Sequence, residues 1–265
     1  MYNSWHIALR YLLYRWKAKG RKGYGIHSPF VFDLVTKVLN DDRFFYAYES
    51  IEEQRRLLLS DEENLEVLDW GAGGKQARTA LRPIAKVAAR SLKSPKYARL
   101  LFRLVQYFQS RQVLELGTCL GITASYLAAS SDEVQVTTLE GAPAYVQKAR
   151  EIFENLRIKN IRVVEGNFDD TLLGVLKESR TWDFVFIDGN HRLEPTLRYF
   201  EQILPHAHAG TLFVFDDIHW SREMEEAWQK IQQHPSVTLT IDLFFVGLVF
   251  IRPEQIAKEH FIIPF

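Results

Sequence analysis

Cysteine is almost absent from this sequence, and its scarcity limits the classes of protein to which the chain can belong. Cys119 is the only cysteine among 265 residues, so no disulfide can form within the chain. Small secreted domains depend on several such bonds, whereas a single free cysteine is typical of a reducing compartment. We therefore expect a cytoplasmic protein whose stability comes from an apolar core.

Long hydrophobic runs are missing as well. The longest, at residues 243–251, is far too short to cross a bilayer, which takes about 20 apolar residues. Residues 1–16 include His6, Arg10 and Arg15 and offer no small-residue cleavage site, so they do not resemble a signal peptide. The sequence thus predicts a soluble protein without a transmembrane segment.

Acidic residues are lacking from two stretches, although the net charge of the whole chain is zero. Residues 1–32 contain six Lys or Arg and no acid, and residues 71–113 contain ten and again no acid. Some basic residues of the second stretch recur every three or four positions, as on one helical face: Lys75, Arg78, Arg82, Lys86, Arg90 and Lys93. Such a face could bind an anionic partner, but we favour a solvated face that pairs with the acidic segment at residues 41–66.

The spacing of apolar residues divides the chain near residue 93. Residues 1–93 show mostly helical spacing and predict a helical N-terminal extension. Because proline suits the first turn of a helix, Pro83 and Pro95 predict helices at residues 83–92 and 95–109. A lid over an active site, a dimer contact and attachment to an anionic surface all remain open as roles for the extension.

Within residues 94–265, from Gln112 onward, short apolar strands alternate with helical stretches, the pattern of a parallel sheet with helices on both faces. The expected strands lie at 113–116, 134–139, 161–165, 184–187 and 211–215, and the helices at 122–129, 144–156, 171–178, 194–203 and 222–233. Two last strands, 237–244 and 246–251, are so close that only an antiparallel hairpin can join them. The prediction is a Rossmann-like, doubly wound α/β sheet, mostly parallel, with an antiparallel C-terminal hairpin.

The first of these strands leads into a glycine loop with the sequence VLELGTCLG at residues 113–121. Such a loop at the start of a helix lets backbone N–H groups approach a ligand. The dinucleotide-binding pattern fails because Cys119 and Ile122 stand where it requires glycine, and a P-loop fails because Ile122 follows Gly121. What remains resembles the first motif of class I S-adenosylmethionine-dependent methyltransferases. In that family the loop wraps the amino-acid end of the cofactor, which implies four contacts here: Glu115, Gly117, Thr118 and Gly121.

The next two strands end in residues that extend this resemblance. Glu140, followed by Gly141, occupies the place of the acid that accepts the ribose hydroxyl protons, although a strand-end Glu can also be a solvated loop residue. Asn167 and Phe168 match the segment that contacts the adenine in this family, and their alternative is a turn after an edge strand. The resemblance implies S-adenosylmethionine as the cofactor.

A second glycine-rich segment, VLDWGAGG at residues 67–74, also resembles a methyltransferase loop. It is followed by a basic stretch, which we expect to be helical up to residue 92, and not by a strand that ends in an acid. Without that acid a ribose would have no partner. We therefore interpret this segment as a structural turn within the extension.

Polar residues also follow the fourth and fifth expected strands, where ligands gather in parallel sheets. The first group contains Asp188 and His191, and the second contains Asp216, Asp217 and His219. Three neighbouring carboxylates would repel one another, so a divalent cation such as Mg²⁺ would neutralise them. Alternatively, Asp188 contacts cofactor or substrate, and Asp216 or Asp217 caps the next helix.

This layout resembles the metal-dependent O-methyltransferases of the catechol and macrolide-sugar types over residues 95–252. The resemblance implies that Asp188, Asp216 and Asp217 bind Mg²⁺, and that His191 or His219 takes the proton of a substrate hydroxyl. Either histidine could equally be structural. The strings GIHSPF at residues 25–30 and DDIHW at residues 216–220 resemble a group of bacterial class I methyltransferases, a likeness that implies no substrate.

The leading hypothesis is methyl transfer from S-adenosylmethionine to a hydroxyl of a small molecule by a class I methyltransferase domain at residues 94–265. One alternative is a methyltransferase that acts on RNA or protein, suggested by the basic stretches; no aromatic-rich RNA-binding motif accompanies them, which argues against nucleic acid as a partner. Another is a cofactor-binding protein that has lost catalysis. The base rate among oligomers favours a homodimer.

Overall fold

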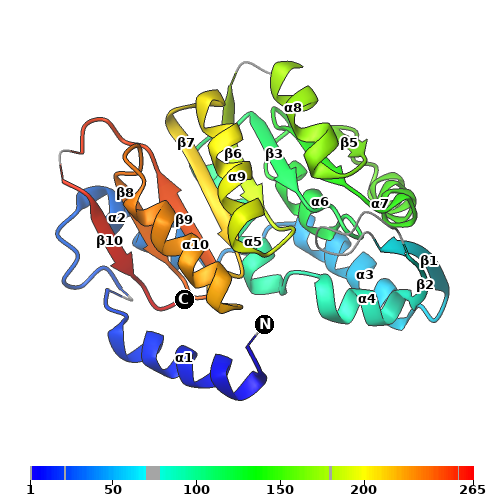
Figure 1. The fold of residues 1–265 in the computed structure, drawn as a ribbon, viewed down its shortest axis with the longest axis horizontal. Helices are drawn as coiled ribbons and strands as arrows, with labels where there is room; N and C mark the ends of the chain where they lie inside the picture. The colour runs from blue at the N-terminus through cyan, green and yellow to red at the C-terminus, as the bar shows by residue number, and fades with distance from the viewer. Residues whose placement is uncertain (1, 21, 70–77, 179–180, 256) are drawn as a thin grey trace. The chain divides into compact units, whose positions relative to one another are not determined.

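The computed structural model describes residues 2–20, 22–69, 78–178, 181–255 and 257–265. Its internal contacts distinguish two compact units: unit 1 consists of Met1–Asp42 and Ser179–Phe265, and unit 2 consists of Arg43–Glu178 (Figure 1). The glycine-rich stretch at residues 71–74 lies outside the described residues, as do Arg21 and Lys75 of the basic stretches.

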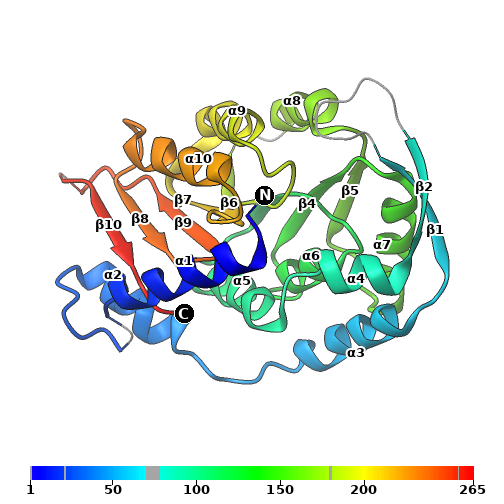
Figure 2. The ribbon, with the colours of Figure 1, turned by 60° about the horizontal axis from the view of Figure 1, so that its bottom comes forward.

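In the described part of unit 2, parallel strands lie in the order β3-β4-β5, namely β3 (Gln112–Leu116), β4 (Gln135–Glu140) and β5 (Ile161–Glu165). A helix follows each strand in turn: α6 (Ile122–Ala128), α7 (Pro143–Asn155) and α8 (Phe168–Glu178). Figure 2 shows α8 on one side of these strands and α6 on the other. The strands and helices predicted for this region are confirmed, with small shifts of their ends.

The part of the predicted extension that lies in unit 2 contains an antiparallel hairpin as well as helices. Strand β1 (Asn64–Asp69) pairs with β2 (Arg78–Pro83), between α3 (Ala47–Ser60) and α4 (Ile84–Ser91). The helical interpretation of this basic stretch was therefore wrong for residues 78–83. A spacing of four residues is also an even number, so it places two side chains on one face of a strand as well as on one face of a helix.

Helices α3 and α4 share an apolar core with α6 and with α5 (Pro95–Tyr107), the helix that Pro95 predicted. Tyr48 of α3 lies at its centre and is 1% exposed. Its ring contacts Phe102 of α5 at 5.0 Å between centroids and Tyr126 of α6 at 5.5 Å. Glu52 of α3 also accepts a hydrogen bond from the Tyr126 hydroxyl at 2.7 Å. Residues before and after position 93 thus pack into one core.

The described residues of unit 1 form five strands in the order β10-β8-β9-β7-β6. Strands β6 (Trp182–Ile187) and β7 (Ala207–Asp216) are parallel, and β9 (Val246–Phe250) runs antiparallel to both β7 and β8 (Leu239–Asp242). The predicted antiparallel hairpin of β8 and β9 is confirmed. Strand β10 (Glu259–Ile262), parallel to β8, was not predicted, because its polar residues Glu259 and His260 break the apolar pattern.

The helices of unit 1 come from both ends of the chain. Helices α9 (Leu193–Ile203) and α10 (Arg222–Gln233) pack against each other, and a short 3₁₀ turn, η2 (Leu204–His206), follows α9. At the N-terminus, α1 (Ser4–Lys17) is followed by α2 (Pro29–Leu34) and a π-helical segment, η1 (Val35–Leu39). Ring atoms of Trp228 in α10 lie 2.5 Å from where a Cβ on Gly247 of β9 would stand, so this packing requires glycine.

These elements define a Rossmann-like mixed α/β sheet, mostly parallel, with antiparallel strands near the C-terminus and helices at the N-terminus. The predicted fold class is confirmed. None of the helices in the described part of the chain is long and apolar enough to span a membrane.

Candidate functional site

The loop after β3 is a tight turn in which three residues adopt left-handed backbone conformations. Gly117, Cys119 and Gly121 have φ values of 109°, 47° and 81°. Gly121 precedes α6, and a Cβ there would lie 2.8 Å from Phe153 and 3.0 Å from Ala149, both in α7. Glycine at this position therefore permits both the turn and the close approach of α7 to the start of α6.

A chain of buried hydroxyls fastens the loop to the neighbouring strand. The N–H groups of Gly117 and Thr118 donate to the carbonyl of Leu139 at 3.0 and 3.2 Å. Thr138 Oγ1 donates to Glu115 Oε2 at 2.6 Å and lies 2.6 Å from Thr118 Oγ1. Because each hydroxyl has one proton, Thr118 is the donor to Thr138.

Glu115 lies inside the domain, beneath the loop. Its side chain is fully buried, and burial raises its pKa to about 8, an effect that the hydrogen bond from Thr138 opposes and the charge of Glu140 reinforces. Thr118 is only 2% exposed. The structure thus places these two predicted cofactor contacts where they support the loop, and leaves the backbone of the loop to meet a ligand.

Glu140 ends β4 and joins the glycine loop to the start of α7. Its Oε2 accepts from the Cys119 N–H, and its Oε1 accepts from the Ala142 N–H, each at 2.9 Å. Burial raises the pKa of Glu140, while the main-chain N–H groups around it act in the opposite direction. Each carboxylate oxygen accepts more than one hydrogen bond, so both retain capacity for a ligand hydroxyl.

Asn167 and Phe168 lie at the next strand end, where β5 leads into α8. Asn167 is exposed, and its Oδ1 accepts from the N–H of Asp169 at 3.1 Å, as a helix cap does. Phe168 is half-buried. The N–H of Gly166 donates to the carbonyl of Glu140, next to Gly141, at 2.9 Å, so the two strand ends adjoin. The predicted cofactor residues of unit 2 therefore all lie at the carboxyl ends of β3, β4 and β5.

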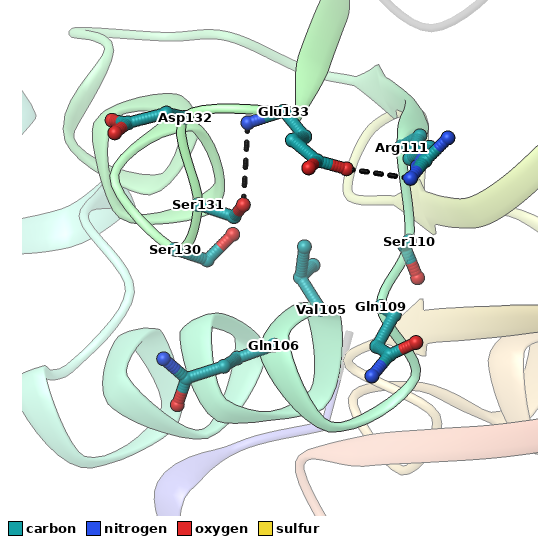
Figure 3. Close-up of a pocket in the computed structure, with 9 residues that line it drawn as sticks. All are labelled: Val105, Gln106, Gln109, Ser110, Arg111, Ser130, Ser131, Asp132 and Glu133. Atoms are coloured by element: carbon teal, nitrogen blue, oxygen red, sulfur yellow. Dashed lines mark hydrogen bonds and ion pairs between the residues drawn. The ribbon is translucent and has the colours of Figure 1, made fainter.

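A polar cavity of about 400 Å³ opens at the other end of these strands (Figure 3). It is formed by the end of α5, the residues that lead into β3 and the turn that leads into β4, where Arg111 pairs with Glu133 at 2.7 Å. Because it lies at the amino ends of β3 and β4, it is separate from the glycine loop, which follows the carboxyl end of β3.

In unit 1, the ends of β6 and β7 bring three candidate metal ligands together. One ligand atom from each of Asp188, His191 and Asp216 lies within 4.8 Å of the others. His191 Nε2 is 3.5 Å from Asp188 Oδ1, and Asp216 is 2% exposed. Two carboxylates and an imidazole match the donor set of a divalent cation, with the nitrogen favouring a transition metal over Mg²⁺.

Among the described residues, Asp217 is not part of this cluster of candidate metal ligands. Its backbone turns into the left-handed region at φ 52°, and its N–H donates to the carbonyl of Phe245 at 2.7 Å. Asp217 instead borders a small hollow beside His219 and Phe244. Consecutive residues at a strand end point in different directions, so adjacent aspartates do not automatically face the same ligand.

His219 is held between two carboxylates. Its Nε2 lies 2.8 Å from Asp242 and its Nδ1 lies 3.2 Å from Glu225, so both ring nitrogens donate protons and the ring is a cation. Burial alone would lower the pKa of His219, but the hydrogen bonds with Asp242 and Glu225 outweigh it and raise the pKa to about 9. The ring also stacks on Phe244 at 5.2 Å. This geometry suits a structural ion pair better than a proton acceptor at neutral pH.

Two supporting residues of these sites were not predicted. Thr138 carries the hydroxyl that links Glu115 to Thr118, and Asp242 binds His219. The available signal was weak, since each is one of several polar residues in its strand: β4 reads QVTTLE and β8 reads LTID. Such residues need a partner when buried, but the sequence does not show which one.

Comparison with known proteins places these features in a class. Residues 114–218 match the family described as a methyltransferase domain. A catechol O-methyltransferase from Niastella koreensis is 28% identical over 128 residues, which is 47% of this chain. The match spans 57% of that relative's own length.

Solved structures share the fold. An O-methyltransferase from Bacillus cereus in complex with SAH superposes with a TM-score of 0.56 at 20% identity, over 83% of this chain and 95% of that one. An SAH-bound methyltransferase from Podospora anserina gives a TM-score of 0.59 at 13% identity, over 95% and 97%. The fold and the match of residues 114–218 identify a Rossmann-like methyltransferase domain. More specifically, the chain is similar to O-methyltransferases, the class of both the Niastella koreensis and the Bacillus cereus protein.

Proposed function

We propose that this protein transfers the methyl group of S-adenosylmethionine to a hydroxyl group of a small molecule. The observation that carries the proposal is the pairing of the glycine loop with Glu140, whose carboxylate lies against the loop at Cys119. The match of residues 114–218 to a methyltransferase domain, the similarity to a catechol O-methyltransferase and the two SAH-bound structural neighbours support it.

The proposal assigns the cofactor to the strand ends of unit 2. The loop backbone between Gly117 and Gly121 would receive the amino-acid end of the cofactor, and Glu140 the ribose hydroxyls. Gly141, Asn167 and Phe168 would adjoin the adenine. The sulfonium is already activated, so the protein's main contribution is to align it with the attacking hydroxyl.

The acceptor side of the reaction is assigned to the cluster in unit 1. Asp188, Asp216 and His191 fit a divalent cation, Mg²⁺ or a transition metal, which would orient a substrate hydroxyl and lower its pKa. A calorimetric titration with Mg²⁺ or Mn²⁺ tests this assignment against the alternative that Asp188 contacts the cofactor or substrate. His191 is the better candidate for the proton acceptor, because His219 is a cation held by Asp242 and Glu225.

The direct test is formation of S-adenosylhomocysteine in the presence of acceptor candidates. Catechols, other phenols and sugar hydroxyls are supplied in turn, with and without Mg²⁺ or Mn²⁺. Product formation with any small hydroxylated acceptor supports the proposal. Methyl transfer only to RNA or to protein would contradict it, as would the lack of any turnover by a chain that binds the cofactor.

The cellular context is also a proposal. The single cysteine, Cys119, is half-buried and has no second cysteine in the chain with which to form a disulfide, which suits the reducing cytoplasm. A homodimer remains the base-rate expectation for the assembly.

A further inference from the structure

Helix α1 carries a stripe of large apolar side chains that are exposed to solvent. Trp5 and Trp16 are 76% and 81% exposed, and Leu9, Leu12 and Leu13 are 48%, 65% and 50% exposed. At 3.6 residues per turn, the five side chains cover about 100° of the helix surface. Exposed apolar patches of this kind on a folded protein mark surfaces that bind another protein, a membrane or a ligand.

The opposite side of α1 is already packed within unit 1. Tyr14 is buried, and its hydroxyl donates to the carbonyl of Ile263. The ring of Tyr11 contacts Phe244 edge-on at 5.0 Å, and Arg10 pairs with Glu225. Figures 1 and 2 both show α1 beside the C-terminus. The helix is thus fixed by its inner side, and the apolar stripe is its outer side.

Positive charges border the stripe, and the stretch of sequence that carries them, residues 1–32, contains no acidic residue. On the helix surface Arg15 and Lys17 fall on the two flanks of the stripe, and Lys19 and Lys22 follow the helix. All four side chains are exposed, and residues 1–32 contain no acid. The stripe is therefore suited to a partner that is apolar inside and anionic at its surface.

We propose that α1 binds the surface of a bilayer that contains anionic phospholipids. The two tryptophans and three leucines would enter the boundary between headgroups and acyl chains, while the flanking cations contact lipid phosphates. With 14 residues α1 is too short to cross the bilayer, so it lies in the plane of the interface. A second copy of the chain fits less well, because a two-fold contact centred on α1 would place this acid-free segment against itself.

This inference is independent of the methyl-transfer reaction, and binding to vesicles tests it. The full chain is sedimented with phosphatidylcholine vesicles and with mixed phosphatidylcholine and phosphatidylglycerol vesicles. We expect binding to the mixed vesicles, weakened roughly tenfold or more by Trp5→Ser with Trp16→Ser. A matched control pair, Tyr46→Ser with Leu81→Ser, removes exposed apolar side chains from unit 2 and should bind as the wild type does.

A second pair of variants tests the electrostatic contribution to vesicle binding. Arg15→Gln with Lys17→Gln should weaken binding to the anionic vesicles by roughly fivefold for each charge removed, and added salt should do the same. Equal binding to both kinds of vesicle would overturn the anionic assignment. Failure of the wild type to bind mixed vesicles would overturn the whole proposal.

A fluorescence measurement does not depend on how the serine variants fold. Brominated lipids in the vesicles should quench the tryptophan fluorescence of the wild type. The variant Trp5→Phe with Trp16→Phe should show a smaller fractional quenching, and equal quenching of the two proteins overturns the proposal. Sedimentation velocity without vesicles tests the competing occupant. A dimer that the serine pair converts to monomer would assign the stripe to a second copy and contradict the lipid proposal.

Discussion

Glu140 and Cys119 are 21 positions apart in the sequence, yet the Glu140 carboxylate accepts a 2.9 Å hydrogen bond from the Cys119 N–H. This contact fixes the glycine loop to the end of β4 while Cys119 holds a left-handed backbone conformation at φ 47°. The acid that we propose for the cofactor ribose thus also shapes the loop that we propose for the rest of the cofactor. Loop geometry and cofactor affinity should therefore change together when Glu140 is altered.

Gly121 should be far less tolerant of a side chain than a glycine in an open position. We expect Gly121→Ala to lower the free energy of unfolding by about 2 to 4 kcal/mol, because φ is 81° and the new Cβ would meet Phe153. Gly174→Ala in α8 is the matched control, since no atom lies within 4 Å of its Cβ position. It should stabilise the protein by about 1 kcal/mol. Urea unfolding measures both, and equal effects would contradict this account of the loop.

Glu115 should make the protein less stable as pH rises. Its pKa is about 8 in the folded protein and near 4.5 in the unfolded chain, so between these values the unfolded state binds fewer protons. Stability should then fall by about 3 to 5 kcal/mol from about pH 4.5 to about pH 8. Glu115→Gln, which keeps the shape without the charge, should remove this part of the decline. A variant with the same pH dependence as the wild type would show that Glu115 is ionised or solvated.

His219 should contribute stability that is lost at a higher pH. Its folded pKa of about 9 exceeds the usual value near 6.5, so its ion pairs stabilise the protein fully below about pH 6.5 and fade as pH rises through 9. We expect His219→Gln to lose about 2 to 3 kcal/mol at about pH 6, because Asp242 and Glu225 lose their cation.

The control for this variant is His208→Gln, which alters the exposed pair with Asp183. It should change stability by less than about 1 kcal/mol. Thermal unfolding across the pH range checks both variants. A His219→Gln protein that is as stable as the wild type but inactive would instead support the proton-acceptor role considered from the sequence.

The metal proposal separates two adjacent aspartates. We expect Asp216→Asn to weaken Mg²⁺ or Mn²⁺ binding by roughly tenfold or more, and Asp217→Asn to change it by less than about twofold. Calorimetric titration of each cation, with cofactor present, measures this, and thermal unfolding confirms that the variants are folded. Equal losses would restore Asp217 to the ligand set, and a wild-type protein that binds neither cation would exclude the metal.

The sequence was sufficient to predict those helices and strands whose apolar residues recur at a regular spacing. The strand at residues 161–165 was predicted with its exact bounds, because this short run with three β-branched residues lies between the turn residues Asn160 and Gly166. The loop at residues 113–121 was placed correctly, because it follows a buried apolar strand and contains two glycines. The β1 and β2 hairpin was missed, since the spacing of Arg78 and Arg82 fits both a helix and a strand. Strand β10 was missed because its pairing with β8 depends on contacts that its own residues do not reveal.

The sequence predicted which residues lie at the candidate site better than it predicted how their side chains are oriented. Strand ends located Glu140, Asp188 and Asp216, since the carboxyl ends of parallel strands are where ligands bind. Side-chain direction was not accessible from the sequence. Glu115 points into the core, and His219 turns toward Asp242, a residue 23 positions away whose pairing only the folded chain creates.

The central claim is that the loop and Glu140 hold S-adenosylmethionine, and isothermal calorimetry of cofactor binding tests it most directly. The wild type should bind the cofactor, Glu140→Ala should weaken binding by roughly tenfold or more, and Glu154→Ala on the exposed side of α7 should leave it unchanged. Unchanged affinity in Glu140→Ala, or a folded wild type that does not bind S-adenosylmethionine, would contradict the account.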